Sequence, residues 1–213
     1  MDSVFGMNPQ WLCLISLWFG LGYLCGSIPF GLLIARVFGL GNLREIGSGN
    51  IGATNVLRTG SKPAAAGTLL LDALKGTLPV FVANYGWHID MAIAAGFGAF
   101  IGHILPIWLN FRGGKGVATY VGILLGFGWP LLAVFAVVWL TLAATLRYSS
   151  LAALVASLAV PTYVFVFGDI HGDLKLPMAL LAMTVIVYLT HRENIVRLIN
   201  GEETRIGSKP KPS

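Results

Sequence analysis

Long apolar runs alternate with short polar segments along almost the whole chain. The apolar runs are Trp11–Ala35, Ala64–Ala83, Met91–Leu109, Val117–Leu146, Leu151–Phe167 and Leu176–Thr190. A helix needs about 20 apolar residues to cross the hydrocarbon core of a bilayer. The pattern therefore predicts an all-α polytopic membrane protein. Within the first run, Ser27 and Pro29 predict a kink or a close helix contact.

The fourth apolar run, Val117–Leu146, is longer than one crossing needs and shorter than two full crossings. Its middle reads Gly126-Phe127-Gly128-Trp129-Pro130, and glycine and proline in this order predict a tight turn. As a hairpin, the run brings the chain to about seven transmembrane helices. The first half of the hairpin must then be short, tilted or only partly inserted.

The basic residues support seven crossings. In that topology one side of the membrane holds Arg36, Arg44, Arg58, Lys62, Arg112, Lys115, Arg147, Arg192, Arg197, Arg205, Lys209 and Lys211. The other side holds Asp2, Asp90, Asp169 and Asp173, with Lys175 as its only cation. Cytoplasmic loops collect lysine and arginine, so we expect the N-terminus outside and the C-terminus inside. A single crossing in the fourth run would separate Arg147 and the basic tail from the other basic loops.

Composition agrees with a lipid environment. The 213 residues are 56% hydrophobic and only 11% charged, whereas soluble domains carry roughly 25% charged residues. We expect a short extension over 1–10, one membrane domain over 11–200 and a cytoplasmic basic tail over 201–213. The net charge of +5 lies in short patches, which suits anionic substrates better than nucleic acid. Cys13 and Cys25 have neither metal-site spacing nor a polar setting, and packing is their expected role.

The first polar segment on the basic side is Gly47-Ser48-Gly49-Asn50-Ile51-Gly52-Ala53-Thr54-Asn55-Val56-Leu57-Arg58. Its opening matches the dinucleotide fingerprint, but that motif needs a preceding strand, and an apolar helix precedes it here. A glycine loop still lets backbone N–H groups approach an anion, and Arg58 can grip a phosphate with two hydrogen bonds. Ser48, Asn50, Thr54 and Asn55 add hydrogen-bonding groups. A solvated loop with a topology-setting arginine explains the spacing equally well.

The second segment runs from Asn110 to Thr119 and contains Gly113-Gly114-Lys115-Gly116. It lacks the first spaced glycine of a P-loop, and Gly116 replaces the Ser or Thr that follows the lysine there, so a nucleoside triphosphate site is not expected. Three glycines and a lysine remain at the start of a helix, where unpaired N–H groups favour an anion. The alternative is a turn with a membrane-flanking lysine.

The third segment, Thr190-His191-Arg192-Glu193-Asn194, ends the last apolar run. His191 titrates near neutral pH and can accept a proton from a hydroxyl. His191 and Asn194 share a helix face, while Glu193 is spaced to pair with Arg197. The alternative for His191 is an interfacial side chain. Ser150 begins another helix on this side, either as an N-cap or as part of an anion site.

Three polar residues lie deeper in the apolar runs. Asp72 and Lys75 are spaced to neutralise each other on one helix. An unpaired charge at mid-membrane costs about 2.5–3.5 kcal/mol on insertion scales, so this pair should face the protein interior. We expect it to be structural or to support the site, and we expect His103 to pack in the core.

These segments resemble a known family, the bacterial acyl-phosphate:glycerol-3-phosphate acyltransferases. The resemblance rests on GSIPFG at Gly26–Gly31, GSGNIGATNVLR at Gly47–Arg58, LDALKG at Leu71–Gly76, GH at Gly102-His103, GGKGVAT at Gly113–Thr119 and HREN at His191–Asn194. The motifs occur in the family's order up to about Gly201. Arg112 stands where the family more often has lysine, which keeps the charge.

The resemblance implies a seven-helix inner-membrane protein whose active site faces the cytoplasm. The implied reaction transfers an acyl group from acyl phosphate to glycerol 3-phosphate, giving lysophosphatidic acid and phosphate, the first acylation step of phospholipid synthesis. We expect the catalytic residues to be Ser48, Arg58, His191 and Asn194. We expect the substrate-binding residues to be Gly47, Gly49, Asn50, Thr54, Asn55, Gly113, Gly114, Lys115, Gly116, Thr119 and Ser150. The Gly113–Gly116 loop is associated with glycerol phosphate in this family.

The residues agree with a donor that is already activated. No histidine has the aspartate of an H-x4-D motif, because the corresponding positions are Ile93, Trp108, Leu176 and Val196, and there is no G-x-S-x-G motif. A phosphate leaving group needs cations and N–H donors rather than a nucleophilic serine. We expect direct transfer, with either His191 or a donor phosphate oxygen as the base.

The expected partners are acyl phosphate, glycerol 3-phosphate, membrane lipid and the soluble enzyme that makes acyl phosphate. We expect no cofactor, metal or nucleic acid. A small transporter for phosphorylated solutes is the alternative function, but transporters place polar groups near the bilayer midplane in paired halves. A scaffold without activity explains the helices but not three glycine-rich or polar segments on one side.

Overall fold

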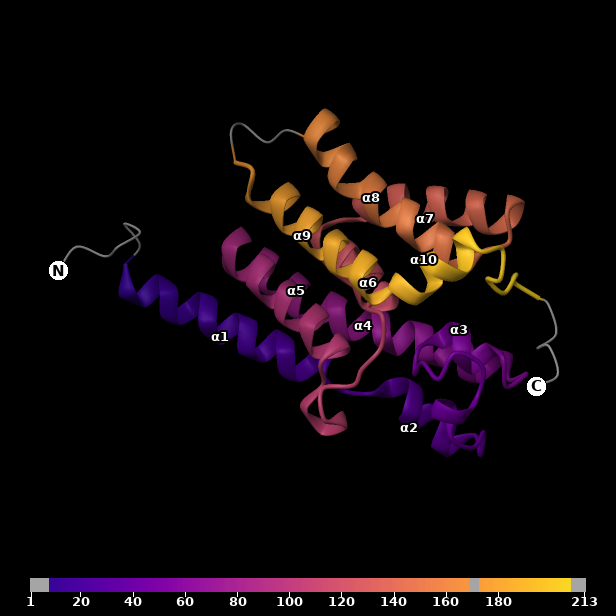
Figure 1. The fold of residues 1–213 in the computed structure, drawn as a ribbon. Coiled ribbons are helices and arrows are strands. Elements are labelled where there is room, and N and C mark those ends of the chain that lie inside the picture. The colour runs from indigo at the N-terminus through magenta and orange to yellow at the C-terminus, as the bar shows by residue number, and fades with distance from the viewer. Residues whose placement is uncertain (1–7, 169–172, 208–213) are drawn as a thin grey trace.

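The computed structural model describes residues 8–168 and 173–207, and over these ranges the secondary structure is entirely helical (Figure 1). The α-helices are α1 (Pro9–Gly26), α2 (Phe30–Val37), α3 (Ala53–Leu57), α4 (Lys62–Gly86), α5 (Ile89–Ile104), α6 (Val117–Phe127), α7 (Trp129–Thr145), α8 (Ser149–Phe167), α9 (Lys175–Thr190) and α10 (Arg192–Ile199). Two 3-10 turns are η1 (Leu43–Glu45) and η2 (Ile107–Leu109). The all-α architecture expected from the apolar pattern is confirmed.

Among the described residues, four segments are long and apolar enough to cross a membrane. These segments are Pro9–Val37, Lys62–Gly86, Ile89–Leu109 and Ser149–Phe167. The shorter apolar helices are α6, α7 and α9, with 11, 17 and 16 residues. The fourth apolar run is therefore a helical hairpin with a short first half, as its internal turn residues predicted.

Gly128 joins the two helices of this hairpin. It ends α6 and precedes α7 with φ 157° and ψ 149°, a backbone conformation that is essentially restricted to glycine. Pro130 in the first turn of α7 cannot donate the backbone N–H that a continuous helix would need there. The two residues together explain why the apolar run divides at this point.

The first apolar run is broken between α1 and α2, which confirms the predicted interruption at Ser27 and Pro29. The break leaves the carbonyl oxygen of Ile28 without a helical hydrogen bond. Lys75 Nζ, on α4, donates to this oxygen at 2.8 Å. Just before the break, α1 packs directly on α5. A Cβ atom on Gly22 or Gly26 would overlap the α5 backbone, so only glycine permits this approach.

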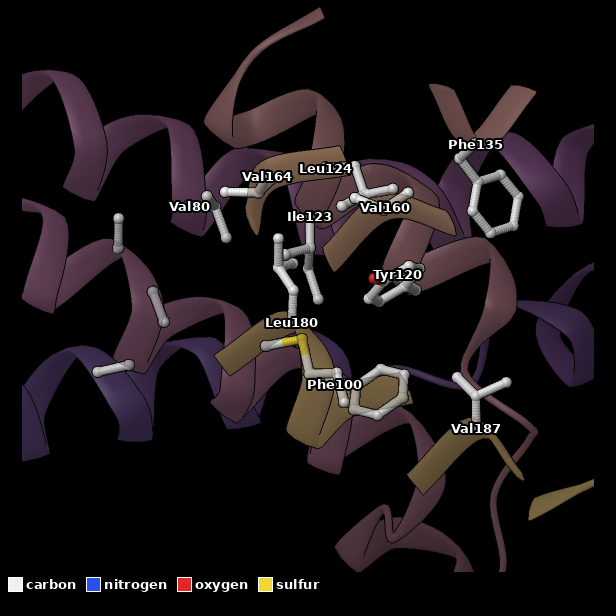
Figure 2. Packing of buried hydrophobic residues seen from close by; sticks show 14 of the residues in the cluster. Val80, Phe100, Tyr120, Ile123, Leu124, Phe135, Val160, Val164, Leu180 and Val187 are labelled. Atoms are coloured by element: carbon white, nitrogen blue, oxygen red, sulfur yellow. The ribbon is translucent and has the colours of Figure 1, made fainter. Parts of the chain in front are cut away.

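The hydrophobic core lies where α4, α5, α6, α8 and α9 meet. Figure 2 shows Phe100, Tyr120 and Leu180 converging there from three of these helices, and all three side chains are fully buried. Val80 and Val160 close the cluster from α4 and α8. Tight packing of this kind fixes the helix ends that carry the polar loops.

The two ends of the bundle have different chemistry. At one end, Asp90 accepts from Trp11 Nε1 at 3.2 Å and from Lys175 Nζ at 2.9 Å, which ties α1, α5 and α9 together. At the other end lie α2, α3, the start of α4 and α10 (Figure 1). The topology prediction also used Asp2, Asp169, Lys209 and Lys211, which lie outside the described residues.

Candidate active site

The Gly47–Arg58 segment is built around the side chain of Asn55. The Asn55 Oδ1 atom accepts from the Ser48 N–H at 3.1 Å. Its Nδ2 donates to the carbonyl oxygens of Leu43 at 3.0 Å and Asn50 at 2.7 Å. Asn55 is buried, so it stabilises the loop from inside, and its expected role in substrate binding stays a prediction.

Several backbone N–H groups that we expected to be available to an anion already donate hydrogen bonds within this loop. The Gly49 N–H donates to the Ile46 carbonyl oxygen at 2.9 Å, and the Gly52 N–H donates to Asn50 Oδ1 at 3.0 Å. Gly47 has φ 57°, and its Cα lies so close to Arg58 that a Cβ would come within 2.9 Å of a guanidinium nitrogen. The exposed side chains of Ser48 and Thr54 and the half-buried Arg58 remain as the groups that can meet a ligand.

The Gly113–Gly116 loop is held to the end of α5 by backbone hydrogen bonds. Gly113 N–H donates to the Ile104 carbonyl oxygen at 2.9 Å, and Gly114 N–H donates to that of His103 at 3.0 Å. Gly116 has φ 87° and begins α6 without a side-chain cap. The first turn of a helix has N–H groups without helical partners and a partial positive charge, which suit a phosphate.

Thr119 lies in the first turn of α6, and its side chain faces the protein interior. Its side chain is fully buried, and its backbone carbonyl oxygen packs against Gly76 of α4. The expected role of Thr119 in substrate binding stays a prediction.

Arg44 joins the two loops. Its guanidinium donates to the carbonyl oxygen of Arg112 and, at 3.4 Å, to that of Gly49. Partial burial and the nearby Arg112 charge lower the pKa of Arg44, although a guanidinium stays charged at any physiological pH. Arg44 was used in the sequence only to assign topology, and no motif signalled this connection.

His191 lies between α9 and α10 and is 4% exposed. Its Nδ1 atom lies 2.8 Å from the carbonyl oxygen of Val187. A carbonyl oxygen only accepts, so Nδ1 carries the hydrogen and Nε2 keeps a lone pair. Burial lowers the pKa of His191 to about 4, and the positive charge of Lys115 adds to the effect. The imidazole is therefore neutral at physiological pH.

Lys115 connects the second loop to the third segment. Its ammonium donates to Asn194 Oδ1, and its carbonyl oxygen accepts from Thr190 Oγ1 at 3.2 Å. Burial lowers the pKa of Lys115, and the charges of Arg197 and Arg58 lower it further. Lys115 thus lies within electrostatic reach of Arg197 and Arg58, while Glu203 and Glu193 offset part of this positive charge.

Glu203 organises this region, and the sequence interpretation missed it. Its Oε1 accepts from Ser150 Oγ at 2.8 Å and from Asn194 Nδ2 at 2.7 Å. Its Oε2 pairs with Arg197 Nε at 2.8 Å. Burial alone would raise the pKa of this carboxyl group, but the three hydrogen bonds hold it below its usual value.

The Glu203 contacts correct one expected pair. Arg197 pairs with Glu203 and not with Glu193, because the chain turns back after α10. Arg147 strengthens this return, since its guanidinium donates to the Ile206 carbonyl oxygen at 2.7 Å. The part of the expected basic tail that the structure describes, up to Gly207, is thus bonded to α8 and α10.

The structure brings several expected residues into one region. Lys115 contacts Asn194 directly, Glu203 links Asn194 to Ser150, the charge of Lys115 acts on His191, and the charge of Arg58 acts on Lys115. Within residues 8–168 and 173–207, no group of three His, Cys, Asp or Glu side chains is arranged to hold a metal ion. The arrangement is a cationic site with a neutral imidazole at its edge, suited to phosphorylated ligands.

Comparison with known proteins identifies the family. A glycerol-3-phosphate acyltransferase family model matches residues 16–201. The glycerol-3-phosphate acyltransferase of Bradyrhizobium diazoefficiens is 56% identical over 189 residues, covering 89% of this chain and 93% of that protein. The enzyme of the same name from Rhizobium meliloti is 53% identical over 204 residues, covering 96% of each chain.

Solved structures agree with the sequence relatives. A crystal structure of an integral membrane glycerol 3-phosphate acyltransferase in its glycerol 3-phosphate form superposes with a TM-score of 0.84. It is 35% identical and covers 93% of this chain and 96% of that one. The lysophosphatidic acid form superposes with a TM-score of 0.83 at 34% identity. These matches confirm the resemblance carried by the motifs, and the chain belongs to the glycerol-3-phosphate acyltransferase family.

Proposed function

We propose that this glycerol-3-phosphate acyltransferase takes its acyl group from acyl phosphate and releases lysophosphatidic acid and inorganic phosphate. The observation that carries the proposal is the partly buried cation cluster around Lys115, which has no H-x4-D or G-x-S-x-G motif beside it. Such a site can hold phosphates but lacks the groups that activate a thioester or form an acyl-serine. An anhydride with phosphate as its leaving group fits these residues.

The two substrates carry a phosphate each, and two phosphates repel unless cations lie between them. In the proposed site, the first turn of α6 and Lys115 hold glycerol 3-phosphate. Arg58 and Ser48 hold the phosphate of the donor, with Arg58 providing two parallel hydrogen bonds. Holding both substrates in one site converts a bimolecular encounter into a transfer between adjacent groups.

The transfer itself is a single substitution at the acyl carbon. The glycerol hydroxyl oxygen forms the new ester bond, the bond between the acyl carbon and the phosphate oxygen breaks, and phosphate leaves. The hydroxyl proton passes to a phosphate oxygen of the departing group. His191 positions the glycerol substrate, because its Nε2 lone pair can accept a hydrogen bond from a glycerol hydroxyl, and Asn194 positions the phosphate. A neutral imidazole with a pKa near 4 is a weaker base than the departing phosphate.

The site lies on the cytoplasmic side in the proposed topology. We propose seven crossings by α1, α4, α5, α6, α7, α8 and α9 in a bacterial inner membrane, with the N-terminus outside and the C-terminus inside. Support comes from Arg44, Arg58, Lys115 and Arg147, which lie in the segments between crossing helices that the seven-crossing path places on one side. The acyl tail of the donor remains in the bilayer beside the apolar helices. The soluble enzyme that makes acyl phosphate would approach from the cytoplasm.

One assay tests the proposed donor. Purified protein is incubated with glycerol 3-phosphate and, in separate reactions, with acyl phosphate, acyl-CoA or acyl carrier protein loaded with the same chain. We expect lysophosphatidic acid and an equal amount of inorganic phosphate from acyl phosphate alone. Product from a thioester donor at a comparable rate would overturn the proposal. Uptake of labelled glycerol 3-phosphate into vesicles without any product would support the transporter instead.

A further inference from the structure

Three buried polar side chains lie near the two glycine loops, Gly47–Arg58 and Gly113–Gly116. They have no role in the proposed acyl transfer. Asp72 and Lys75 are on α4, and His103 is on the last turn of α5. They are 1%, 5% and 4% exposed, respectively. The Asp72 carboxylate lies 2.6 Å from Lys75 Nζ and 3.7 Å from His103 Nδ1. A buried group of this kind costs free energy of desolvation, so its retention calls for a role in positioning.

The Lys75 side of this group reaches the first loop. Lys75 donates at 2.8 Å to the carbonyl oxygen of Ile28, in the break between α1 and α2. At the start of α2, Gly31 packs so closely on the Ile51 carbonyl oxygen that a Cβ would overlap it. Ile51 belongs to the Gly47–Arg58 loop, so the ammonium of Lys75 fixes the helix break on which that loop rests.

The His103 side reaches the second loop. The His103 carbonyl oxygen accepts from the Gly114 N–H at 3.0 Å. The imidazole edge faces the same glycine, because a Cβ on Gly114 would overlap Nε2 and lie 2.9 Å from Cε1. Lys115 follows directly in the chain. The His103 ring therefore limits how closely the Gly114 backbone can approach α5, and it thereby fixes the backbone position of Lys115.

We propose that Asp72, Lys75 and His103 are positioning residues that fix the two glycine loops relative to each other, and with them the distance between the two bound phosphates. The inference rests on the proposed function, because it assigns one phosphate to each loop. Asp72 is the shared partner, since it contacts both Lys75 and His103. None of the three side chains needs to touch substrate for this role.

The first test uses the contact between His103 and Gly114. His103→Asn keeps a polar side chain beside Asp72 but removes the ring edge that supports Gly114. We expect the KM for glycerol 3-phosphate to rise about fivefold or more, with kcat changed less than about threefold. The matched control is His88→Asn, at the exposed N-cap of α5, where asparagine also caps well and KM should not change.

A compensating pair separates positioning from simple core packing. Gly114→Ala should raise the KM for glycerol 3-phosphate because its methyl group overlaps the imidazole. Combining it with His103→Ala opens the space for that methyl group, and we expect the double variant to bind glycerol 3-phosphate better than Gly114→Ala alone. If the KM increases of the two single variants multiply in the double variant, the imidazole of His103 does not position Gly114 and the proposal is overturned.

The Asp72–Lys75 pair is tested by removing both charges together, since a single change would leave an uncompensated buried charge. The variant is Asp72→Asn with Lys75→Met. We expect it to fold and to show a raised KM for both substrates. Wild-type KM values in this variant would contradict the proposal.

Binding is also measured without turnover. The rise in Tm that glycerol 3-phosphate causes reports binding to the native state in the absence of any acyl donor. We expect a smaller rise for His103→Asn than for wild type, and an equal rise would count against the role of His103. If wild-type protein binds glycerol 3-phosphate but forms no product from acyl phosphate, the proposed donor fails while this binding test still decides the positioning role.

Discussion

The Nδ1–H of His191 donates to the carbonyl oxygen of Val187 one turn earlier, at 2.8 Å. This bond fixes both the tautomer and the orientation of the imidazole, a task that an aspartate performs in many histidine-dependent enzymes. The orienting group here is backbone, so no residue type in the sequence could reveal it. The Nε2 lone pair is left to accept from a ligand or from water.

Arg58→Lys should lower kcat/KM about tenfold or more, although the charge is kept. The reason is that lysine cannot donate two parallel hydrogen bonds to one phosphate. Gly47 also packs against the Arg58 side chain, so a narrower side chain leaves the loop less supported. Initial rates over a range of acyl phosphate and glycerol 3-phosphate concentrations provide the measurement.

The matched control for this variant is Arg36→Lys. Arg36 lies in the last turn of α2 and is exposed, on the same basic side in the proposed topology. It should keep wild-type kinetics. Equal kinetics for wild type, Arg58→Lys and Arg36→Lys would mean that Arg58 only contributes to topology.

Glu203→Gln should lower both Tm and activity. The substitution removes the charge that Arg197, Asn194 and Ser150 stabilise together. A hydrogen bond to a charged group contributes about 1.5–3 kcal/mol, which corresponds to a fall in Tm of roughly 3–12 °C for a chain of this size. The neighbouring Glu202→Gln, at an exposed position, is the control and should change neither quantity.

The Glu203 contribution also depends on pH. The folded-state pKa of this carboxyl group lies below its ordinary value of 4.5. The stability it provides is therefore fully present above pH 4.5 and is lost as the pH falls through the lower folded-state pKa. Wild-type Tm should fall with acidification below pH 4.5 more steeply than the Tm of Glu203→Gln, and parallel curves would contradict this role.

The proposed topology predicts which positions an impermeant thiol reagent can reach on intact cells. In a background without Cys13 and Cys25, a cysteine at His88 should be labelled, because it lies in the turn between α4 and α5 on the outer side. A cysteine at Glu202 should be labelled only after the membrane is permeabilised. Labelling of the Glu202 position on intact cells would exclude seven crossings in this orientation.

The helices could be predicted closely because their signals are local. Gly128 and Pro130 mark the hairpin, and Ser27 and Pro29 mark the break between α1 and α2, each through a backbone effect of the residue itself. The i, i+3 spacing of Asp72 and Lys75 likewise predicted their ion pair, which the structure confirms.

The site could be predicted only in part because its contacts are not local. Glu203 follows the last helix and was counted with the basic tail, yet it bonds to Ser150, 53 residues earlier in the chain. Asn55 and Thr119 lie within the expected motifs, but their side chains are buried, and a motif alone does not reveal burial. Motifs identify which segments form the site, whereas packing decides which of their side chains face the ligand.

The final prediction concerns the pH dependence conferred by His191. Its folded-state pKa of about 4 lies below the ordinary value of 6.5. Between these values the unfolded chain binds the proton more tightly, so stability is complete above pH 6.5 and is lost as the pH falls toward 4. The full effect is about 3 kcal/mol. Tm measured from pH 7 to pH 4 should therefore decline less steeply for His191→Gln than for wild type.

The same variant identifies the proton acceptor. A phosphoryl oxygen has a second pKa of about 6, which makes it a stronger base than an imidazole with a pKa of about 4. We therefore expect His191→Gln, whose side-chain oxygen can still accept a hydrogen bond from a glycerol hydroxyl, to retain activity within about tenfold of wild type and to keep the acidic limb of the pH–rate profile. His191→Ala should lose about a hundredfold, because the positioning group is gone. If His191→Gln folds and binds both substrates normally but is as inactive as His191→Ala, then His191 itself accepts the proton.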